Sequence, residues 1–501
     1  MNMRNNRIKL AVSAFLMSTT VTVQANPSGA QKASPPVIDK YGTTMKEVHA
    51  AAKAKYPNQK DWPPAKPEAI EAWKDLRYGM FIHWGPVSLT GQDISWSRGK
   101  NVPLEVYDNL YKRFNPIKFN ADEWVSLAKA SGMKYMVLTT KHHDGFCLWD
   151  SQYTDYDIMS TPFKRDIVGE LAEACKKQGI KFGAYYSQVD WHHPDSPFSG
   201  CRGQTIRDKY DMDVYEEYAL NQTRELIEKY GPLLTIWNDL PTFGYLNRGV
   251  STIRTIRAAQ PDILVNDRTG SGGDYGTPEQ KIGGFNNKWP WESCMTVSRR
   301  SAWAWGGEND GVKDFKTCLM FLISAAGKDG NILLNVGPTP DGEIAQVQRD
   351  LLLEMGKWTE KYGESIYATR GGPYKSAKNL GSTHKGNTVY LHILSWEGEK
   401  LELPALPKKI LKSELLTGGK VDVQQSSQGV TVTVAKEFQQ PIDTIVKLEL
   451  DGPAKEIAPI EVSAPEQPKP KVVDPTKVKD GEALNAGDLM EAEKQKESGI
   501  K

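Results

Sequence analysis

Three acidic side chains in this sequence could supply a pair of carboxyl groups for nucleophilic and acid–base chemistry. Asp239 follows an apolar, strand-like run, where a carboxylate can attack an electrophilic sugar carbon, or can cap a helix or pair with Arg268. In a retaining glycosidase its partner would lie about 5 Å away. Glu279, in a Gly-rich loop, and Glu292, between aromatic residues, are the two candidates. Desolvation would raise the pKa of Glu292, as an acid requires. If it has no catalytic role, Glu279 is a solvated loop charge. In the same case, Glu292 is a buried partner of Arg268 or His83.

Histidines and several charged side chains follow the strand-like runs in the sequence. They are His83, His142, His143, His192, His193, Asp144, Asp190, Asp239, Asp267, Arg268 and Glu292. A metal-dependent hydrolase is therefore an alternative. Its ligands usually come as His-x-His, however, and the adjacent His142 and His143 would point to opposite sides of a strand. The five cysteines include no CxxC pair, which disfavours a thiolate zinc site. We expect no metal.

The elements that must position these side chains alternate between strand and helix from Trp62 to Ala368. The strand-like runs are short, apolar and bounded by turn residues, as in parallel strands buried on both faces. No GxGxxG follows the first run, which disfavours a dinucleotide-binding fold. The alternation predicts an α/β fold, a (β/α)₈-like TIM barrel, whose catalytic groups lie at the carboxyl ends of strands. The runs are 79–83, 135–139, 182–186, 233–237, 263–265 and 332–336.

Composition divides the 501 residues into five segments. Residues 1–25 have the basic start, apolar stretch and small-residue cleavage site of a signal peptide, which predicts export to the periplasm or beyond. An N-terminal segment, 26–61, precedes the barrel at 62–368. Alternating runs at 369–451 predict a C-terminal antiparallel β-sandwich. The Pro-, Lys- and Glu-rich residues 452–501 have the composition of a disordered tail.

The overall composition excludes several classes of protein. The net charge of +1 argues against a nucleic-acid-binding protein, which would be strongly basic. The mean hydropathy is −0.53, and no apolar stretch of about 18 residues follows the N-terminus, so no membrane span is predicted. Ten of the 14 tryptophans lie between Trp84 and Trp305. Indole faces suit sugar rings, although any single tryptophan is more often a core residue.

Seven motifs in order resemble the α-L-fucosidases of glycoside hydrolase family 29. Each motif is weak alone, but together they extend from Trp62 to Tyr367. They are Arg77-Tyr-Gly-Met-Phe-Ile-His-Trp-Gly85, Lys141-His-His-Asp-Gly-Phe146, Tyr185-Tyr-Ser187, Trp237-Asn-Asp239, Asn266-Asp-Arg268, Trp291-Glu-Ser-Cys294 and Gly330-Asn-Ile-Leu-Leu-Asn-Val-Gly-Pro338.

The resemblance implies a retaining exo-α-L-fucosidase that acts on fucosylated glycans and needs no metal or cofactor. It matches Asp239 to the nucleophile of the family. It favours Glu279 over Glu292 as the acid/base, because Glu279 falls where the loop after Asn-Asp-Arg carries that residue. The substrate-binding positions that it implies are His83, Trp84, His142, His143, Tyr185, Trp237 and Arg268. Trp237 with Phe81 would face the methyl group of a 6-deoxy sugar.

Two departures from the family pattern leave alternatives open. Where the family usually has Glu-Trp-Tyr, this chain has Ile94-Ser-Trp-Ser97, so a pocket acid is missing or replaced by Asp93. Leu240 and Pro241 follow Asp239 where Gly is frequent. The alternatives are a member acting on a related sugar such as α-L-galactose, and a non-catalytic fucose-binding module. Both candidate acids are present, which argues against the module.

Overall fold

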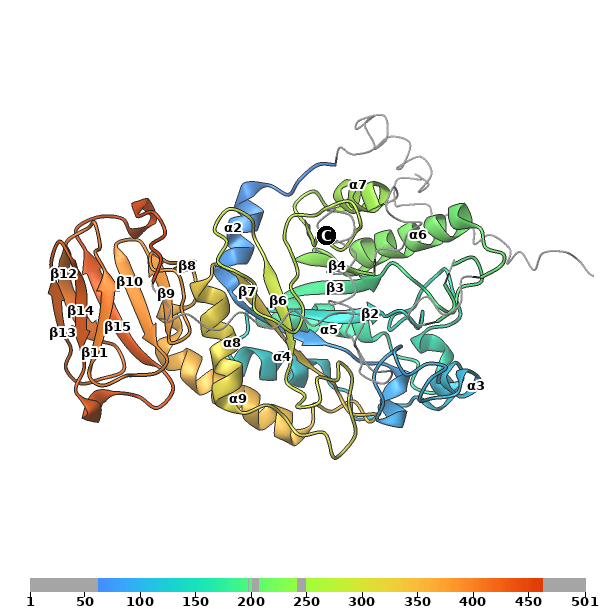
Figure 1. The fold of residues 1–501 in the computed structure, drawn as a ribbon. Helices are drawn as coiled ribbons and strands as arrows, with labels where there is room; N and C mark the ends of the chain where they lie inside the picture. The colour runs from blue at the N-terminus through green and yellow to red at the C-terminus, as the bar shows by residue number, and fades with distance from the viewer. Residues whose placement is uncertain (1–61, 197, 201–206, 241–248, 463–501) are drawn as a thin grey trace, which may run out of the picture. The chain divides into compact units, whose positions relative to one another are not determined.

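The computed structural model describes residues 62–196, 198–200, 207–240 and 249–462. Its larger part is a curled parallel sheet with helices around it, drawn from blue to yellow in Figure 1. The strand order is β5-β4-β3-β2-β1-β7-β6. The strands are β1 (Tyr78–Ile82), β2 (Tyr135–Lys141), β3 (Lys181–Ser187), β4 (Thr235–Asp239), β5 (Leu264–Val265), β6 (Glu292–Thr296) and β7 (Asn331–Val336).

Isolated parallel bridges close this sheet into a ring. Asn266, just after β5, pairs with Tyr275, while Gly276 pairs with Trp291 and Glu279 with Cys294 of β6. Residues 275–279 therefore take the place between β5 and β6, and the spatial order follows the chain order all the way round. This arrangement confirms the predicted (β/α)₈-like barrel.

Helices cover the outside of the ring, and a side chain caps the first turn of several of them. The side chain of Asn120 accepts a hydrogen bond from the amide of Glu123, and Asp166 accepts one from Gly169. Such caps satisfy amide groups that lack a partner within the helix. The helices are α2 (Pro67–Leu76), α3 (Leu104–Tyr107), α4 (Ala121–Ala130), α5 (Ile167–Gln178), α6 (Met212–Tyr230), α7 (Gly249–Ala259), α8 (Phe315–Gly327) and α9 (Gln346–Tyr362).

Two hydrophobic cores lie on opposite faces of the sheet. The outer core joins strands to helices and includes Met80 and Ile82 of β1. The inner core fills the barrel and includes Phe81 of β1 and Tyr135 of β2. Trp73 of α2 belongs to the inner core, and α2 leads directly into β1, so this helix closes the amino-terminal end of the barrel. The carboxyl ends of the strands remain available for the site.

The C-terminal part consists of two antiparallel sheets, as predicted. One has the order β12-β15-β10-β9-β8 and the other β11-β14-β13. Ala454 and Ile457 belong to their shared core, so the packed region extends beyond residue 451. The strands are β8 (Arg370–Gly371), β9 (Leu380–Lys385), β10 (Thr388–Ile393), β11 (Lys400–Pro404), β12 (Ile410–Leu415), β13 (Asp422–Gln425), β14 (Gly429–Thr433) and β15 (Thr444–Leu450).

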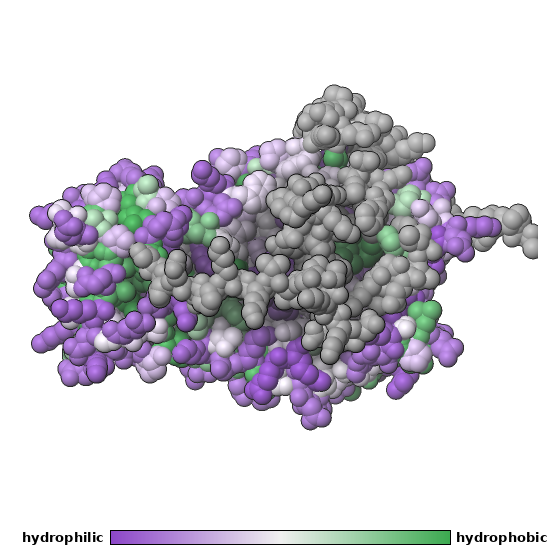
Figure 2. Space-filling view, in the orientation of Figure 1, coloured by the Kyte–Doolittle hydropathy of each residue, from purple (hydrophilic) through white to green (hydrophobic). Residues whose placement is uncertain are grey.

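Side chains at the surface are mainly hydrophilic on the face shown in Figure 2, with apolar ones visible over the sandwich. Leu411 of β12 is 58% exposed. Among the described residues, no helix has the length and apolar character needed to cross a membrane. The predicted signal peptide, the N-terminal segment and most of the predicted tail lie outside the described residues.

Candidate active site

Asp239 is the last residue of β4 and lies at the mouth of the barrel. Side chains alternate along a strand, so Trp237 and Asp239 both face the interior. The Asp239 carboxylate accepts hydrogen bonds from the Tyr185 hydroxyl at 2.7 Å and from Arg268 Nη1 at 2.9 Å. A third comes from the amide of Leu240 at 2.8 Å. These donors hold both oxygens of the carboxylate in fixed directions.

The surroundings of Asp239 keep it ionised although it is only 9% exposed. Burial alone would raise its pKa. The charge of Arg268, with hydrogen bonds from Arg268 and Tyr185, more than offsets burial and lowers the pKa below its usual value. An ionised, oriented carboxylate is what a nucleophile requires.

Glu279 lies on the same side of the pocket as Arg268 and contacts the same guanidinium nitrogen as Asp239. Its Oε2 is 2.8 Å from Arg268 Nη1, and Asp239 Oδ1 is 2.9 Å from that atom. Because Asp239 Oδ1 and Glu279 Oε2 contact the same nitrogen, the distance between these two oxygens cannot exceed the sum of the two contact distances. Retaining glycosidases hold their two carboxyl groups about 5 Å apart, and the upper limit set by Arg268 allows that spacing.

Arg268 is itself held rigidly. Its Nε donates to Thr277 Oγ1 at 3.0 Å, and its Nη2 donates to the Thr277 carbonyl at 3.0 Å. The guanidinium carbon lies 4.8 Å from the centre of the Trp237 ring. Thr277 and Glu279 both belong to the segment that closes the barrel, so closure and placement of the two carboxylates depend on the same five residues.

Glu292 is not in the pocket. Its predicted position was after a strand, but it is the first residue of β6 and is buried at the amino end of the barrel. One carboxylate oxygen accepts a hydrogen bond from the Tyr135 hydroxyl and the other from Trp237 Nε1 at 3.1 Å. Burial raises its pKa to about 7. Its partners are therefore not Arg268 or His83, and it supports Trp237 from below.

Three histidines line the pocket, and the Nδ1 atom of each forms a hydrogen bond with a neighbouring side chain. The partners are Asn335 Oδ1 for His83 at 2.6 Å, Ser95 Oγ for His142 at 2.6 Å, and Ser187 Oγ for His143 at 2.8 Å. Ser187 donates its own proton to the Val189 carbonyl, so His143 donates through Nδ1 and leaves Nε2 as an acceptor.

Burial keeps these imidazoles neutral. It lowers the pKa of His83 to about 3 and that of His143 to about 4, and it lowers the pKa of His142 well below its usual value. A neutral imidazole can accept a hydrogen bond from a sugar hydroxyl, which a protonated one cannot.

The pocket that these residues share has mostly aromatic walls. Tyr185 stacks on Trp237 with ring centres 5.5 Å apart. Trp96, Cys294 and Trp303 were not among the predicted site residues. Tryptophan enrichment was the available signal for the two tryptophans, and the Trp291-Glu-Ser-Cys294 motif for Cys294. The lining residues are Phe81, His83, Trp96, His142, His143, Tyr185, Trp237, Asp239, Leu240, Arg268, Glu279, Cys294 and Trp303.

Other residues singled out in the sequence lie elsewhere. Trp84 points outward, because it neighbours the inward-facing His83, and its ring packs against Trp124 at 5.1 Å. It is a core residue, not part of the pocket lining. His192 stacks on Tyr156 with ring centres 4.0 Å apart, away from the pocket lining.

Asp93 also lies outside the lining. Its Oδ1 accepts hydrogen bonds from the amides of Ile94, Trp303 and Ala304. Burial raises its pKa to about 6, although these amides pull it down. Asp93 therefore does not replace a pocket acid.

One group of pocket side chains has donor atoms close enough to hold a metal ion. Donor atoms of His142, His143 and Asp239 lie within 4.8 Å of one another. Asp239, however, already binds the guanidinium of Arg268 at 2.9 Å, and a fixed positive charge there opposes a second cation. The donor set fits a carbohydrate pocket better than a metal centre.

A (β/α)₈-like barrel with two carboxylates in an aromatic pocket has the architecture of a glycoside hydrolase. A family model described as alpha-L-fucosidase matches residues 43–364. The chain belongs to the alpha-L-fucosidase family.

Individual relatives agree with this assignment. The tissue alpha-L-fucosidase of Bos taurus is 31% identical over 375 residues, which cover 67% of this chain and 77% of the bovine one. The chain is similar in structure to alpha-L-fucosidase isoenzyme 1 from Paenibacillus thiaminolyticus, with a TM-score of 0.71, 33% identity, and coverage of 77% of this chain and 99% of that one. A GH29 alpha-L-fucosidase from Bacteroides thetaiotaomicron, solved as a covalent intermediate with 2-fluoro-fucosyl fluoride, gives a TM-score of 0.69, 27% identity, and coverage of 78% and 98%.

Proposed function

We propose that this protein is a retaining exo-α-L-fucosidase that removes terminal α-L-fucose from glycans. The observation that supports this most strongly is the contact of Asp239 and Glu279 with one nitrogen of Arg268. It brings a nucleophile and an acid/base to the spacing that a double displacement needs.

In the first step, the Asp239 carboxylate attacks C1 of fucose. The bond from C1 to the glycosidic oxygen breaks, and Glu279 gives its proton to that oxygen. In the second step, Glu279 takes a proton from water, the water oxygen attacks C1, and the ester to Asp239 breaks. Two inversions at C1 release fucose with its configuration retained.

Arg268 can stabilise both steps because one of the two carboxyl groups beside it is negatively charged in each state. Before the attack, Asp239 carries the charge and Glu279 is protonated. In the fucosyl intermediate, Asp239 is a neutral ester and Glu279 is ionised. The charge passes between two oxygens that lie 2.9 and 2.8 Å from the same Nη1 atom. A preorganised cation that needs no movement stabilises both states.

Recognition of the sugar follows from the neutral imidazoles and the aromatic walls. Nε2 of His83 and of His143 accept hydrogen bonds from ring hydroxyls. Phe81 and Trp237, with ring centres 5.2 Å apart, offer an apolar surface to the methyl group. α-L-Galactose carries a hydroxymethyl group there, and its hydroxyl would face apolar rings at a cost. The pocket therefore favours fucose over that alternative.

Relative hydrolysis rates test the function. Aryl α-L-fucoside, aryl α-L-galactoside and aryl β-D-fucoside should be compared, with NMR of the first anomer released. We expect fast cleavage of the first substrate only, and the α-anomer of L-fucose as the initial product. Binding of fucose without turnover would instead indicate a module that lacks catalysis.

The chain is also proposed to be exported, either to the periplasm or to the medium. The support is the sequence of residues 1–25, with its basic start, apolar stretch and small-residue cleavage site. Residues 62–368 would form the catalytic domain and the following β-sandwich its partner domain. N-terminal sequencing of protein from the periplasm or the medium should start at Asn26.

A further inference from the structure

Two loops that follow the barrel strands on either side of β7 meet beside the pocket. Residues 86–103 follow β1, and residues 298–312 follow β6. A Cβ atom added to Gly91 would lie 3.3 Å from Gly307 Cα, so the backbones of the two loops are in close contact. Each loop also contributes a tryptophan to the pocket, Trp96 from the first and Trp303 from the second.

Asp93 connects these loops through one carboxylate oxygen. Its Oδ1 accepts from the amide of Trp303 at 2.9 Å and from that of Ala304 at 3.0 Å. The amide of Ile94, in its own loop, donates to the same oxygen at 3.1 Å. Hydrogen bonds from amides to an ionised acceptor are stronger than neutral ones.

The hydrogen bonds continue from this link to a sugar-facing histidine. The Trp303 carbonyl accepts from Asn335 Nδ2 at 2.7 Å, and Asn335 Oδ1 binds His83 Nδ1 at 2.6 Å. The rings of Trp303 and His83 are 4.8 Å apart. The backbone of Trp303 is thus held on one side by Asp93 and on the other by the residue that orients His83.

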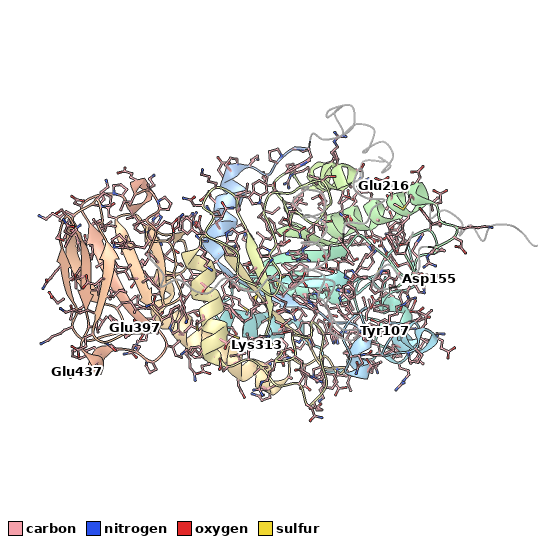
Figure 3. All side chains as sticks on the ribbon, in the orientation of Figure 1. Tyr107, Asp155, Glu216, Lys313, Glu397 and Glu437 are labelled. Atoms are coloured by element: carbon pink, nitrogen blue, oxygen red, sulfur yellow. The ribbon has the colours of Figure 1, made fainter. Side chains whose placement is uncertain are left out.

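The end of the second loop is fixed separately. Lys313, labelled in Figure 3, donates to the Thr296 carbonyl at 2.7 Å, and Ser298 Oγ donates to Asp310 at 2.8 Å. The first contact ties the end of the loop to β6, the second joins the two ends of the loop, and neither involves Trp303. Loss of the Asp93 contacts should therefore move Trp303 without unfolding the loop.

We propose that Asp93 is a positioning residue for the proposed fucosidase: it holds Trp303, and through Asn335 also His83, in the arrangement that binds the terminal sugar. The inference rests on the proposed function of the pocket. Asp93, in the loop after β1, holds the backbone of Trp303 and does not itself bind the sugar.

The test compares Asp93→Ala with Asp93→Asn. Alanine removes the acceptor, and the expected result is an approximately tenfold weaker Kd for L-fucose and a similar rise in KM, with kcat changed less. Asparagine keeps an acceptor oxygen for the three amides and should restore binding to within about threefold. Glu308→Gln, an exposed carboxylate change in the same loop, is the control and should behave as wild type. Thermal unfolding confirms that each variant is folded.

A double-mutant cycle with Trp303→Ala distinguishes positioning from general stability. If Asp93 acts partly through the Trp303 ring, Asp93→Ala should weaken binding clearly less in the Trp303→Ala background than in wild type. The part that remains reflects His83, because the backbone carbonyl of residue 303 still accepts from Asn335. Additive effects, or wild-type fucose binding by folded Asp93→Ala, would overturn the inference.

If Asp93→Ala does not fold, Asp93→Glu keeps the charge but displaces the acceptor, and wild-type binding by that variant would also overturn the inference. A wild-type protein that neither binds L-fucose nor cleaves its aryl glycoside would refute the proposed function itself. An active wild type with an unaffected variant would refute the role of Asp93 alone.

Discussion

Asp239 and Glu279 come from different elements of the barrel but meet at a single nitrogen of Arg268. Asp239 ends a regular strand, whereas Glu279 ends the short segment that closes the ring. The shared contact sets an upper limit on the gap between the two carboxylates. It also gives them a common counter-charge.

Loss of the acid should depend on the leaving group. In Glu279→Gln, kcat/KM for a natural fucosylated oligosaccharide should fall by about 10²–10⁴-fold. An aryl fucoside with an acidic phenol needs less protonation and should lose less. Rates on a series of aryl fucosides should show a steeper dependence on phenol pKa than in wild type. An equal loss on all substrates would remove Glu279 from this role.

Glu292 provides the matched carboxylate-to-amide variant. It lies below Trp237 and away from the glycosidic bond, so Glu292→Gln should keep the leaving-group dependence of wild type. The Gln oxygen can accept from Trp237 Nε1, as Glu292 does, and the Gln amide group can donate to the Tyr135 oxygen in place of the bond that the Tyr135 hydroxyl donates to Glu292. A steep leaving-group dependence in this variant would reverse the assignment of the two acids.

The raised pKa of Glu292 should also make the free energy of unfolding depend on pH. Its pKa is raised from 4.5 to about 7 in the folded state, so between these values the folded state binds the proton that the unfolded state has lost. The resulting stabilisation is full below the lower value and lost as pH rises through the upper one, and it amounts to about 3 kcal/mol.

The Gln side chain of Glu292→Gln does not titrate. The free energy of unfolding of this variant should therefore rise relative to that of wild type between pH 5 and pH 7.5. Thermal unfolding midpoints of both proteins at the two pH values measure this change. Parallel pH profiles would show that the Glu292 carboxyl has an ordinary pKa.

Tyr185→Phe tests what keeps Asp239 ionised. The Tyr185 hydroxyl donates to Asp239 Oδ2 at 2.7 Å and lowers the pKa of that carboxyl. Without this donor the pKa of Asp239 rises, so the acid limb of the kcat/KM profile should move to higher pH. The rate at the optimum should fall about tenfold. An unchanged acid limb would mean that another group titrates there.

A chelator distinguishes the carbohydrate pocket from the metal alternative. Dialysis against EDTA followed by assay on an aryl fucoside should leave activity unchanged, because Arg268 already supplies the positive charge beside Asp239. Loss of activity that returns with added divalent metal would instead assign His142, His143 and Asp239 as ligands.

The sequence predicted the strands that are continuous and apolar. All six predicted runs contain or overlap strands of the barrel, because complete burial of a parallel strand selects an unbroken apolar sequence. It did not predict residues 275–279 or β6 as strands. The first contains Gly276 and Pro278, and the second begins with Glu292 and Ser293, so neither has an apolar run to recognise.

Side-chain direction explains the differences in the site. The motifs brought His83, Tyr185, Trp237 and Arg268 to the right end of the barrel. Trp84 was placed in the pocket although alternation from His83 turns it outward. Glu292 was placed after a strand because β6 was not recognised. Trp303 depends on contacts between loops about 210 residues apart, which spacing in the sequence does not reveal.

Trapping of the intermediate tests the central claim most directly. Glu279→Gln should be incubated with 2-fluoro-fucosyl fluoride, digested and analysed by mass spectrometry. We predict one 2-fluorofucosyl group per chain, attached to Asp239, and none in the Asp239→Asn, Glu279→Gln double variant. A label on another carboxylate, or a β-anomer as the first product of the wild-type enzyme, would contradict the account.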